Sequence, residues 1–250
     1  MADTKERTFT YRFLGSLILI LLYIGVVSIP WYGDAAYKWI YDASLRVAVL
    51  IAVILIQFFD KSLYKPSVKI HPYLWPTLLL CFSNLFIYLV FPADRYQSGN
   101  ISLLYQSGLI TLLTVLCEET VFRYSLLPSL RMKFNKHLSI LISAGIFAIC
   151  HIFNLFSGMD IGATFAQIGY TFIIGLLCGF FAIIDDLPLA YIFHFLFNFL
   201  ETDVYLALGG SEWNYKFFLI NIAFGVVFVG YAFFWYAKKL IIKNNNDKDL

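Results

Sequence analysis

The chain has 250 residues, of which 60% are hydrophobic and only 14% are charged, with a formal net charge of +2. Soluble domains carry about 25% charged residues, so this composition excludes an ordinary soluble domain. The basic residues are dispersed rather than gathered in a stripe, which excludes nucleic acid as a partner.

Apolar stretches of about twenty residues, the length that crosses a lipid bilayer, follow one another along the chain. They predict an all-α membrane protein, a polytopic bundle of about eight transmembrane helices. The predicted spans are residues 13–32, 39–59, 73–92, 101–127, 138–157, 161–184, 187–203 and 215–237.

The distribution of Lys and Arg predicts the orientation of these spans, because cytoplasmic loops carry an excess of positive charge. With the N-terminus inside, thirteen basic residues fall on the inner side and four, Lys38, Arg46, Arg95 and Lys216, on the outer side. We therefore predict that both termini are cytoplasmic. Frequent Ile, Phe, Asn and Lys are typical of AT-rich bacterial genomes, so we expect a multi-pass protein of a bacterial cytoplasmic membrane.

Three regions divide the chain. Residues 1–100 hold the first three predicted spans, residues 101–203 hold four spans with most of the polar groups, and residues 204–250 hold the last span and a polar cytoplasmic tail. The four cysteines lie in apolar segments, which indicates buried thiols instead of a disulfide framework.

Two adjacent glutamates and an arginine lie in the fourth span, in the stretch EETVFR. A charged side chain at membrane depth is costly, so it marks a candidate functional site. Glu119 and Arg123 are four residues apart, so on a helix they share a face and can pair. Glu118 lies about 100° round the helix axis and is free to point elsewhere.

Two further spans carry polar groups at similar spacing. Phe147 lies one helical turn before His151 in the stretch FAICH, and His194 lies one turn before Asn198 in the stretch HFLFN. Helix bundles build sites from side chains on facing helices. We therefore expect the three polar stretches to meet in one place.

The three stretches EETVFR, FAICH and HFLFN resemble the EExxxR, FxxxH and HxxxN motifs of the CPBP intramembrane endopeptidases. That family includes the CAAX prenyl proteases and bacteriocin-processing or immunity proteins. The resemblance covers about residues 110–200. It implies glutamate-dependent proteolysis inside the membrane, without a metal or other cofactor, on a peptide or membrane protein such as a lipidated protein or a leader peptide.

The resemblance also implies roles for single residues. Glu118 would be the general base that activates water, and His151 would help to hold that water. His194 and Asn198 would stabilise the oxyanion, since donors aimed at developing charge are worth about 3–4 kcal/mol each where water is excluded. The supporting residues would be Glu119, Arg123 and Phe147.

Other chemistries would use the same residues. A structural ion-pair network would also explain Glu118 and Glu119, although one arginine cannot neutralise both. Two histidines and a glutamate are a possible zinc set, but the chain has no HExxH helix. Cys117 and Cys150 adjoin Glu118 and His151, yet sequence neighbours on a helix diverge, which favours core packing of the thiols.

Two other functions stay open. A member of the same family can act without proteolysis, in bacteriocin self-immunity or by binding a regulatory membrane partner. A transporter is disfavoured because the ionisable residues cluster on three helices and no inverted repeat is visible. Asn154 and Gln167 are expected to form hydrogen bonds between helices.

Overall fold

The computed structural model describes residues 2–28, 37–58, 101–184 and 187–200, together with residues 223, 226, 227, 230, 231 and 234. Within these ranges every regular element is helical and none is a strand, which confirms the all-α class. The predicted span 73–92, nearly all of the span 215–237 and the polar tail lie outside the described residues.

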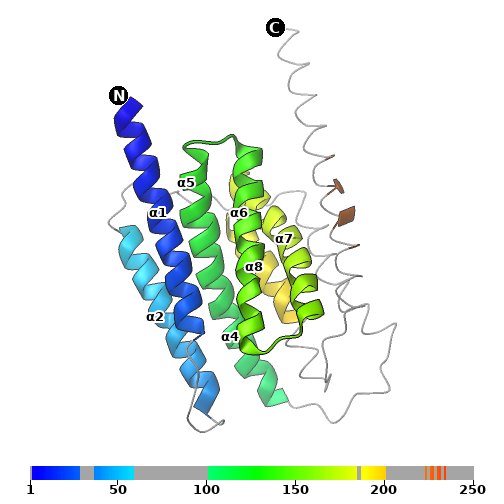
Figure 1. Cartoon of the computed structure of the whole chain (residues 1–250). Helices are drawn as coiled ribbons and strands as arrows, with labels where there is room; N and C mark the ends of the chain where they lie inside the picture. The colour runs from blue at the N-terminus through cyan, green and yellow to red at the C-terminus, as the bar shows by residue number, and fades with distance from the viewer. Residues whose placement is uncertain are drawn as a thin grey trace.

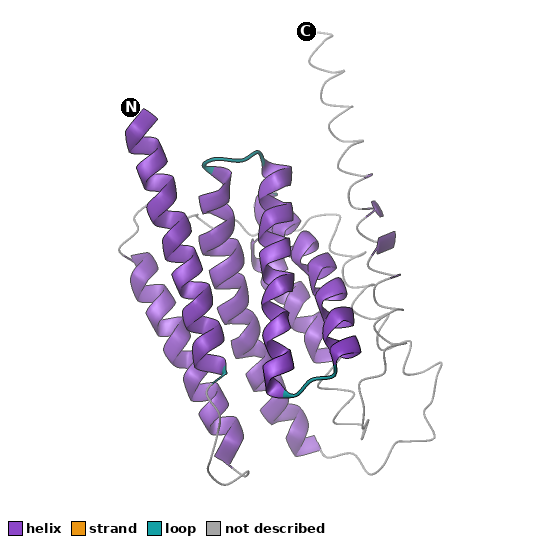
Figure 2. Cartoon of the chain, viewed as in Figure 1, coloured by secondary structure: helices purple, strands orange, loops and turns teal. Residues whose placement is uncertain are grey.

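The helices form one bundle, in which they stand side by side (Figures 1 and 2). The elements are α1 (Ala2–Val27), α2 (Lys38–Phe58), α4 (Ile101–Glu119), the π-helical segment η2 (Thr120–Leu126), α5 (Leu127–Arg131), α6 (Lys136–Cys150), the 3₁₀ segment η3 (His151–Ser157), α7 (Ile161–Ile183) and α8 (Leu187–Asn198). The elements α4, η2 and α5 follow one another without a break and form a single column through the bundle.

Three of the described helical stretches are long and apolar enough to cross a membrane: Glu6–Val26, Lys136–Phe156 and Ile161–Ile183. The outward faces of α1 and α2 carry apolar side chains, for example Leu21 and Ile54, which are 64% and 57% exposed. These features support a membrane protein. The count of eight spans and the cytoplasmic placement of both termini stay predictions.

The N-terminal end of α1 lies at the same end of the bundle as the basic loop between α5 and α6 (Figure 1). The ring of Phe9 packs edge-on against Phe134 of that loop, and the Lys133 ammonium lies 5.2 Å from the centroid of the Phe9 ring. Lys133 therefore lies beside the N-terminal part of α1, and the charge count assigned both to the inner side.

Local sequence explains where α6 and α7 begin. The side chain of Asn135 accepts a hydrogen bond from the backbone N–H of Leu138, and Asp160 does the same for Ala163, each at 3.0 Å. Both are N-cap interactions that satisfy a donor in the first turn of a helix. Gly158 ends η3 with φ = +84°, a left-handed conformation that favours glycine.

A hydrogen bond between side chains links η3 and α7, the elements before and after Gly158. Asn154 Nδ2 donates to Gln167 Oε1 at 2.7 Å, which ties η3 to α7. The prediction that these two residues bond between helices is confirmed.

The buried apolar side chains that the structure describes form two clusters. One gathers side chains of α1, α2 and the α4–η2–α5 column with Phe147 of α6, and the other gathers side chains of α7 and α8. Glu119 and Arg123 belong to the column of the first cluster, and His194 belongs to a helix of the second. Their contact therefore joins the two halves of the core.

Candidate active site

The two adjacent glutamates turn to different partners. Glu119 is completely buried, and its Oε2 lies 3.2 Å from Arg123 Nε, which confirms the predicted pair one turn apart. Glu118 is 8% exposed, and its Oε1 accepts a hydrogen bond of 3.1 Å from the hydroxyl of Tyr23 in α1. Glu118 thus has a partner outside the ion pair, as its position about 100° round the helix axis allows.

His194 of α8 lies between the two carboxylates. Its Nδ1 is 2.8 Å from Glu119 Oε1, and its Nε2 is 3.6 Å from Glu118 Oε2. An ionised carboxylate can only accept, so Nδ1 donates its proton to Glu119. A distance of 3.6 Å is too long for a hydrogen bond, so Nε2 and Glu118 Oε2 both remain available to a third group between them.

Phe147 of α6 packs against three of the polar side chains. Its ring meets the rings of His151 and His194 edge-on, with centroids 5.1 and 5.7 Å apart, and the Arg123 guanidinium lies 4.7 Å from its centroid. Phe147 is 1% exposed. Its position therefore limits the orientations of both imidazoles and of the guanidinium, consistent with the supporting role expected for it.

His151 lies where α6 tightens into η3. Its Nδ1 is 3.0 Å from the carbonyl oxygen of Phe147 one turn earlier, so Nδ1 donates and Nε2 keeps its lone pair in a neutral ring. The half-buried ring packs edge-on against Phe147, whose ring also meets His194, the residue that faces Glu118. The structure thus brings the acid and both imidazoles into one neighbourhood, as the three motifs predicted.

Asn198 is the one predicted catalytic residue for which no such contact is seen. It is half-buried at the C-terminal end of α8, and its side chain makes no hydrogen bond to another residue that the structure describes. Its expected partnership with His194 as a second oxyanion donor stays a prediction.

Arg123 lies in the π-helical segment η2, directly after the two glutamates. Its Nη2 donates a long hydrogen bond of 3.5 Å to the carbonyl oxygen of Gly175 in α7, whereas Nη1 has no hydrogen-bond partner within the described ranges. A Cβ at Gly175 would lie 3.0 Å from Cα and Cβ of Ala144, so glycine allows α7 to approach α6 closely. π-Helical turns occur often at functional sites.

Two polar residues of the N-terminal helices also reach the site, and sequence reasoning did not single them out. The first is Tyr23 of α1, which contacts Glu118. The second is Arg46 of α2, which donates from Nε to Thr114 Oγ1 at 2.6 Å. Thr114 lies one turn before Glu118 on α4. Arg46 lies in α2, which corresponds to the predicted span 39–59, and its assignment to the outer side stays a prediction. The only sequence signal was the presence of a hydroxyl and a guanidinium in stretches of apolar residues.

The thiols fit a packing role better than a catalytic one. Cys117 is fully buried and donates to the backbone carbonyl of Arg46, with a sulfur–oxygen distance of 3.3 Å. Cys150 is half-buried and Cys178 is buried, and no disulfide joins the cysteines that the structure describes. The expectation of buried thiols is therefore confirmed for Cys117 and Cys178.

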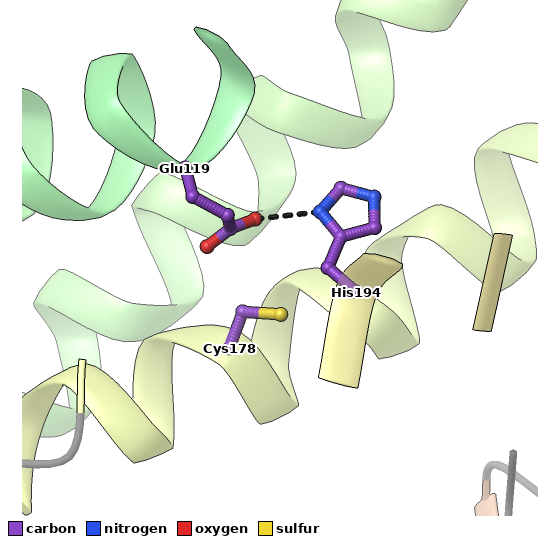
Figure 3. A group of neighbouring side chains, drawn as sticks. All are labelled: Glu119, Cys178 and His194. Atoms are coloured by element: carbon purple, nitrogen blue, oxygen red, sulfur yellow. Dashed lines mark hydrogen bonds and ion pairs between the residues drawn. The ribbon is translucent and has the colours of Figure 1, made fainter. Parts of the chain in front are cut away.

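One group of described side chains brings potential metal ligands together. Glu119, Cys178 and His194 converge from three helices, with their ligand atoms within 4.8 Å of one another (Figure 3). This set differs from the two histidines and a glutamate considered from the sequence. A cation there would compete with the Arg123 guanidinium for the same Glu119 carboxylate, because both would bind one anionic group.

The three motifs of this site lie in a segment that matches a known protein family. Residues 100–200 match the family model described as type II CAAX prenyl endopeptidase Rce1-like. The match contains all three motifs and confirms the resemblance to the CAAX protease family, whose members are peptidases that act on protein substrates in membranes. No curated protein and no solved structure matches the chain.

Proposed function

Because residues 100–200 match the CAAX prenyl endopeptidase family, we propose that this protein is an intramembrane endopeptidase in which Glu118 activates the attacking water. The observation that supports the proposal best is the position of His194. Its Nδ1 is fixed by Glu119, and its Nε2 faces Glu118 Oε2 across 3.6 Å. A water molecule can donate to Glu118 Oε2 and contact His194 Nε2 there.

The reaction begins with proton transfer from water to Glu118 Oε2. The water oxygen forms a bond to the carbonyl carbon of the substrate, and the electron pair of the C=O bond moves to its oxygen. When the tetrahedral intermediate collapses, the C=O bond forms again and the C–N bond breaks. Glu118 then gives its proton to the leaving amine, so the carboxylate is regenerated.

Three other groups would assist this step. His151, with the lone pair of Nε2 available in its neutral ring, would hold the water. His194 and Asn198 would donate to the oxyanion. Since Nδ1 of His194 already donates to Glu119, Nε2 is a donor only when the ring is protonated. Oxyanion stabilisation by His194 therefore requires the imidazolium form.

The substrate of the proposed reaction is a peptide or protein anchored in the membrane, and a prenylated C-terminus is the first class to test. The site of action would be a bacterial cytoplasmic membrane. Purified protein in liposomes would be assayed with a fluorogenic peptide that ends in farnesylated Cys-Val-Ile-Met, and with the same peptide without the lipid.

The expected result is cleavage that chelators leave intact and that Glu118→Gln lowers at least about a hundredfold in kcat. Glu6→Gln, the same change at an exposed position of α1, should retain full activity. Full activity of the Glu118→Gln variant would refute the assigned role. Loss of activity on chelation, restored by zinc, would instead favour Glu119, Cys178 and His194 as a metal centre.

A further inference from the structure

A residue of α1 contacts the proposed general base directly. Tyr23 is 7% exposed, and its hydroxyl lies 3.1 Å from Glu118 Oε1. A carboxylate only accepts, so the phenol donates. Helix α1 lies outside residues 100–200, the part of the chain that matches the peptidase family. We propose that Tyr23 is a positioning residue of the active site, an inference that rests on the proposed role of Glu118.

The carboxylate of Glu118 needs such a partner because its last torsion is soft. The terminal sp³–sp² torsion of glutamate is broad, so packing of the side chain leaves the plane of the carboxylate poorly defined. The Tyr23 hydroxyl holds Oε1 and thereby directs Oε2 toward His194 Nε2, 3.6 Å away. The oxygen that takes the proton from water is thus oriented by a residue of a different helix, α1.

The register of α1 against the catalytic column is fixed by a second contact. Ser16, which is 1% exposed, has its hydroxyl 2.8 Å from the hydroxyl of Ser125 in η2. Ser16 and Tyr23 are seven residues apart, which places them on the same face of α1 two turns from each other. This face of α1 therefore binds the column twice, once at η2 and once at Glu118.

A phenylalanine would fill the same apolar space, so the hydroxyl is the part of Tyr23 that needs explaining. Tyr23 packs in a cluster with Leu19 and Ile20. A hydroxyl without a partner in such surroundings is unfavourable. In this structure its partner is the carboxylate proposed to carry the reaction, which separates a positioning role from simple core packing.

The test compares Tyr23→Phe with Tyr11→Phe, the same change at a position of α1 that is 74% exposed. With the farnesylated Cys-Val-Ile-Met peptide, Tyr23→Phe should lower kcat about ten- to a hundredfold, the equivalent of one hydrogen bond to a charged group. KM should stay within about twofold, because the phenol does not bind the substrate. Unchanged kcat, or a change in KM alone, would overturn the proposal.

A measurement of stability separates this inference from the proposed function. Tyr23→Phe should lower the melting temperature by about 3–12 °C in the wild-type background. It should not lower the melting temperature in a Glu118→Met background, where the acceptor is already gone and the phenol hydroxyl is left unpaired. Equal shifts in both backgrounds would show that the contact is absent, and the inference would fail. If Glu118→Gln kept full activity, the proposed function would fail, while the stability cycle would still decide on the contact.

Discussion

Replacing Arg123 with methionine removes the cation from the most deeply buried charged pair that the structure describes. Both side chains of the Glu119–Arg123 pair are completely buried, with Nε and Oε2 3.2 Å apart. Removal of one partner leaves the Glu119 carboxylate without its counter-charge, and breaking a buried pair in this way costs about 3–5 kcal/mol. For a chain of this size, that loss lowers the melting temperature by about 6–20 °C. We expect a loss near the lower end, about 6 °C, because His194 Nδ1 still donates to Glu119.

The assay uses the thiols of the core. Cys117 and Cys178 are fully buried, so a thiol-specific fluorescent dye reports unfolding as they become accessible in detergent solution. Arg131→Met, the same substitution at an exposed position, is the matched control and should melt within about 2 °C of wild type. An Arg123→Met variant that melts as high as this control would refute the reasoning.

A double variant, Glu119→Met with Arg123→Met, separates stability from activity. It removes both charges, and replacing a buried pair by apolar side chains is often nearly neutral. Most of the lost melting temperature should therefore return. The activity should not return, because His194 Nδ1 has lost the acceptor that fixes its ring. A double variant that is no more stable than Arg123→Met would contradict this account.

Two further substitutions test packing and catalysis with internal controls. Gly175→Ala should melt below Gly145→Ala by the equivalent of about 1–3 kcal/mol. The reason is that a Cβ at Gly175 meets Ala144 at 3.0 Å, whereas a Cβ at Gly145 meets nothing within 4 Å. Equal melting temperatures would argue against close packing of α6 on α7. Asn198→Ala should lower kcat about a hundredfold or more with little change in melting temperature. Asn154→Ala should instead lower the melting temperature and leave kcat unchanged, because Asn154 bonds to α7. The reverse pattern would remove Asn198 from the oxyanion site.

The sequence located α7 and α8 closely, whereas α1 begins eleven residues before the predicted span 13–32. The predicted spans 161–184 and 187–203 correspond to α7 (Ile161–Ile183) and α8 (Leu187–Asn198), because long apolar runs between turn residues leave little choice of boundary. The predicted span 101–127 ends earlier than the helical column, which continues to Arg131. Hydropathy did not reveal this extension, since the column continues beyond its apolar part.

Contacts within one helix were predictable, and contacts between helices were less so. The Glu119–Arg123 pair follows from helical spacing alone. Tyr23 and Glu118 are 95 positions apart, and their contact depends on how α1 is set against α4, which no local pattern specifies. For His194, the motif predicted a polar role but not its acceptor, because spacing on α8 does not say which neighbouring helix the ring will face.

The π-helical segment η2 has a consequence for how the sequences of related chains are aligned. In this segment the backbone N–H of Leu127 bonds to the carbonyl of Phe122, five positions back, so the turn contains one residue more than an α-helical turn. A helical wheel drawn from Glu118 through to α5 therefore assigns the later positions to the wrong face. An alignment of homologues should permit a one-residue gap between Glu119 and Leu127, where a deletion would narrow the turn without interrupting the helix.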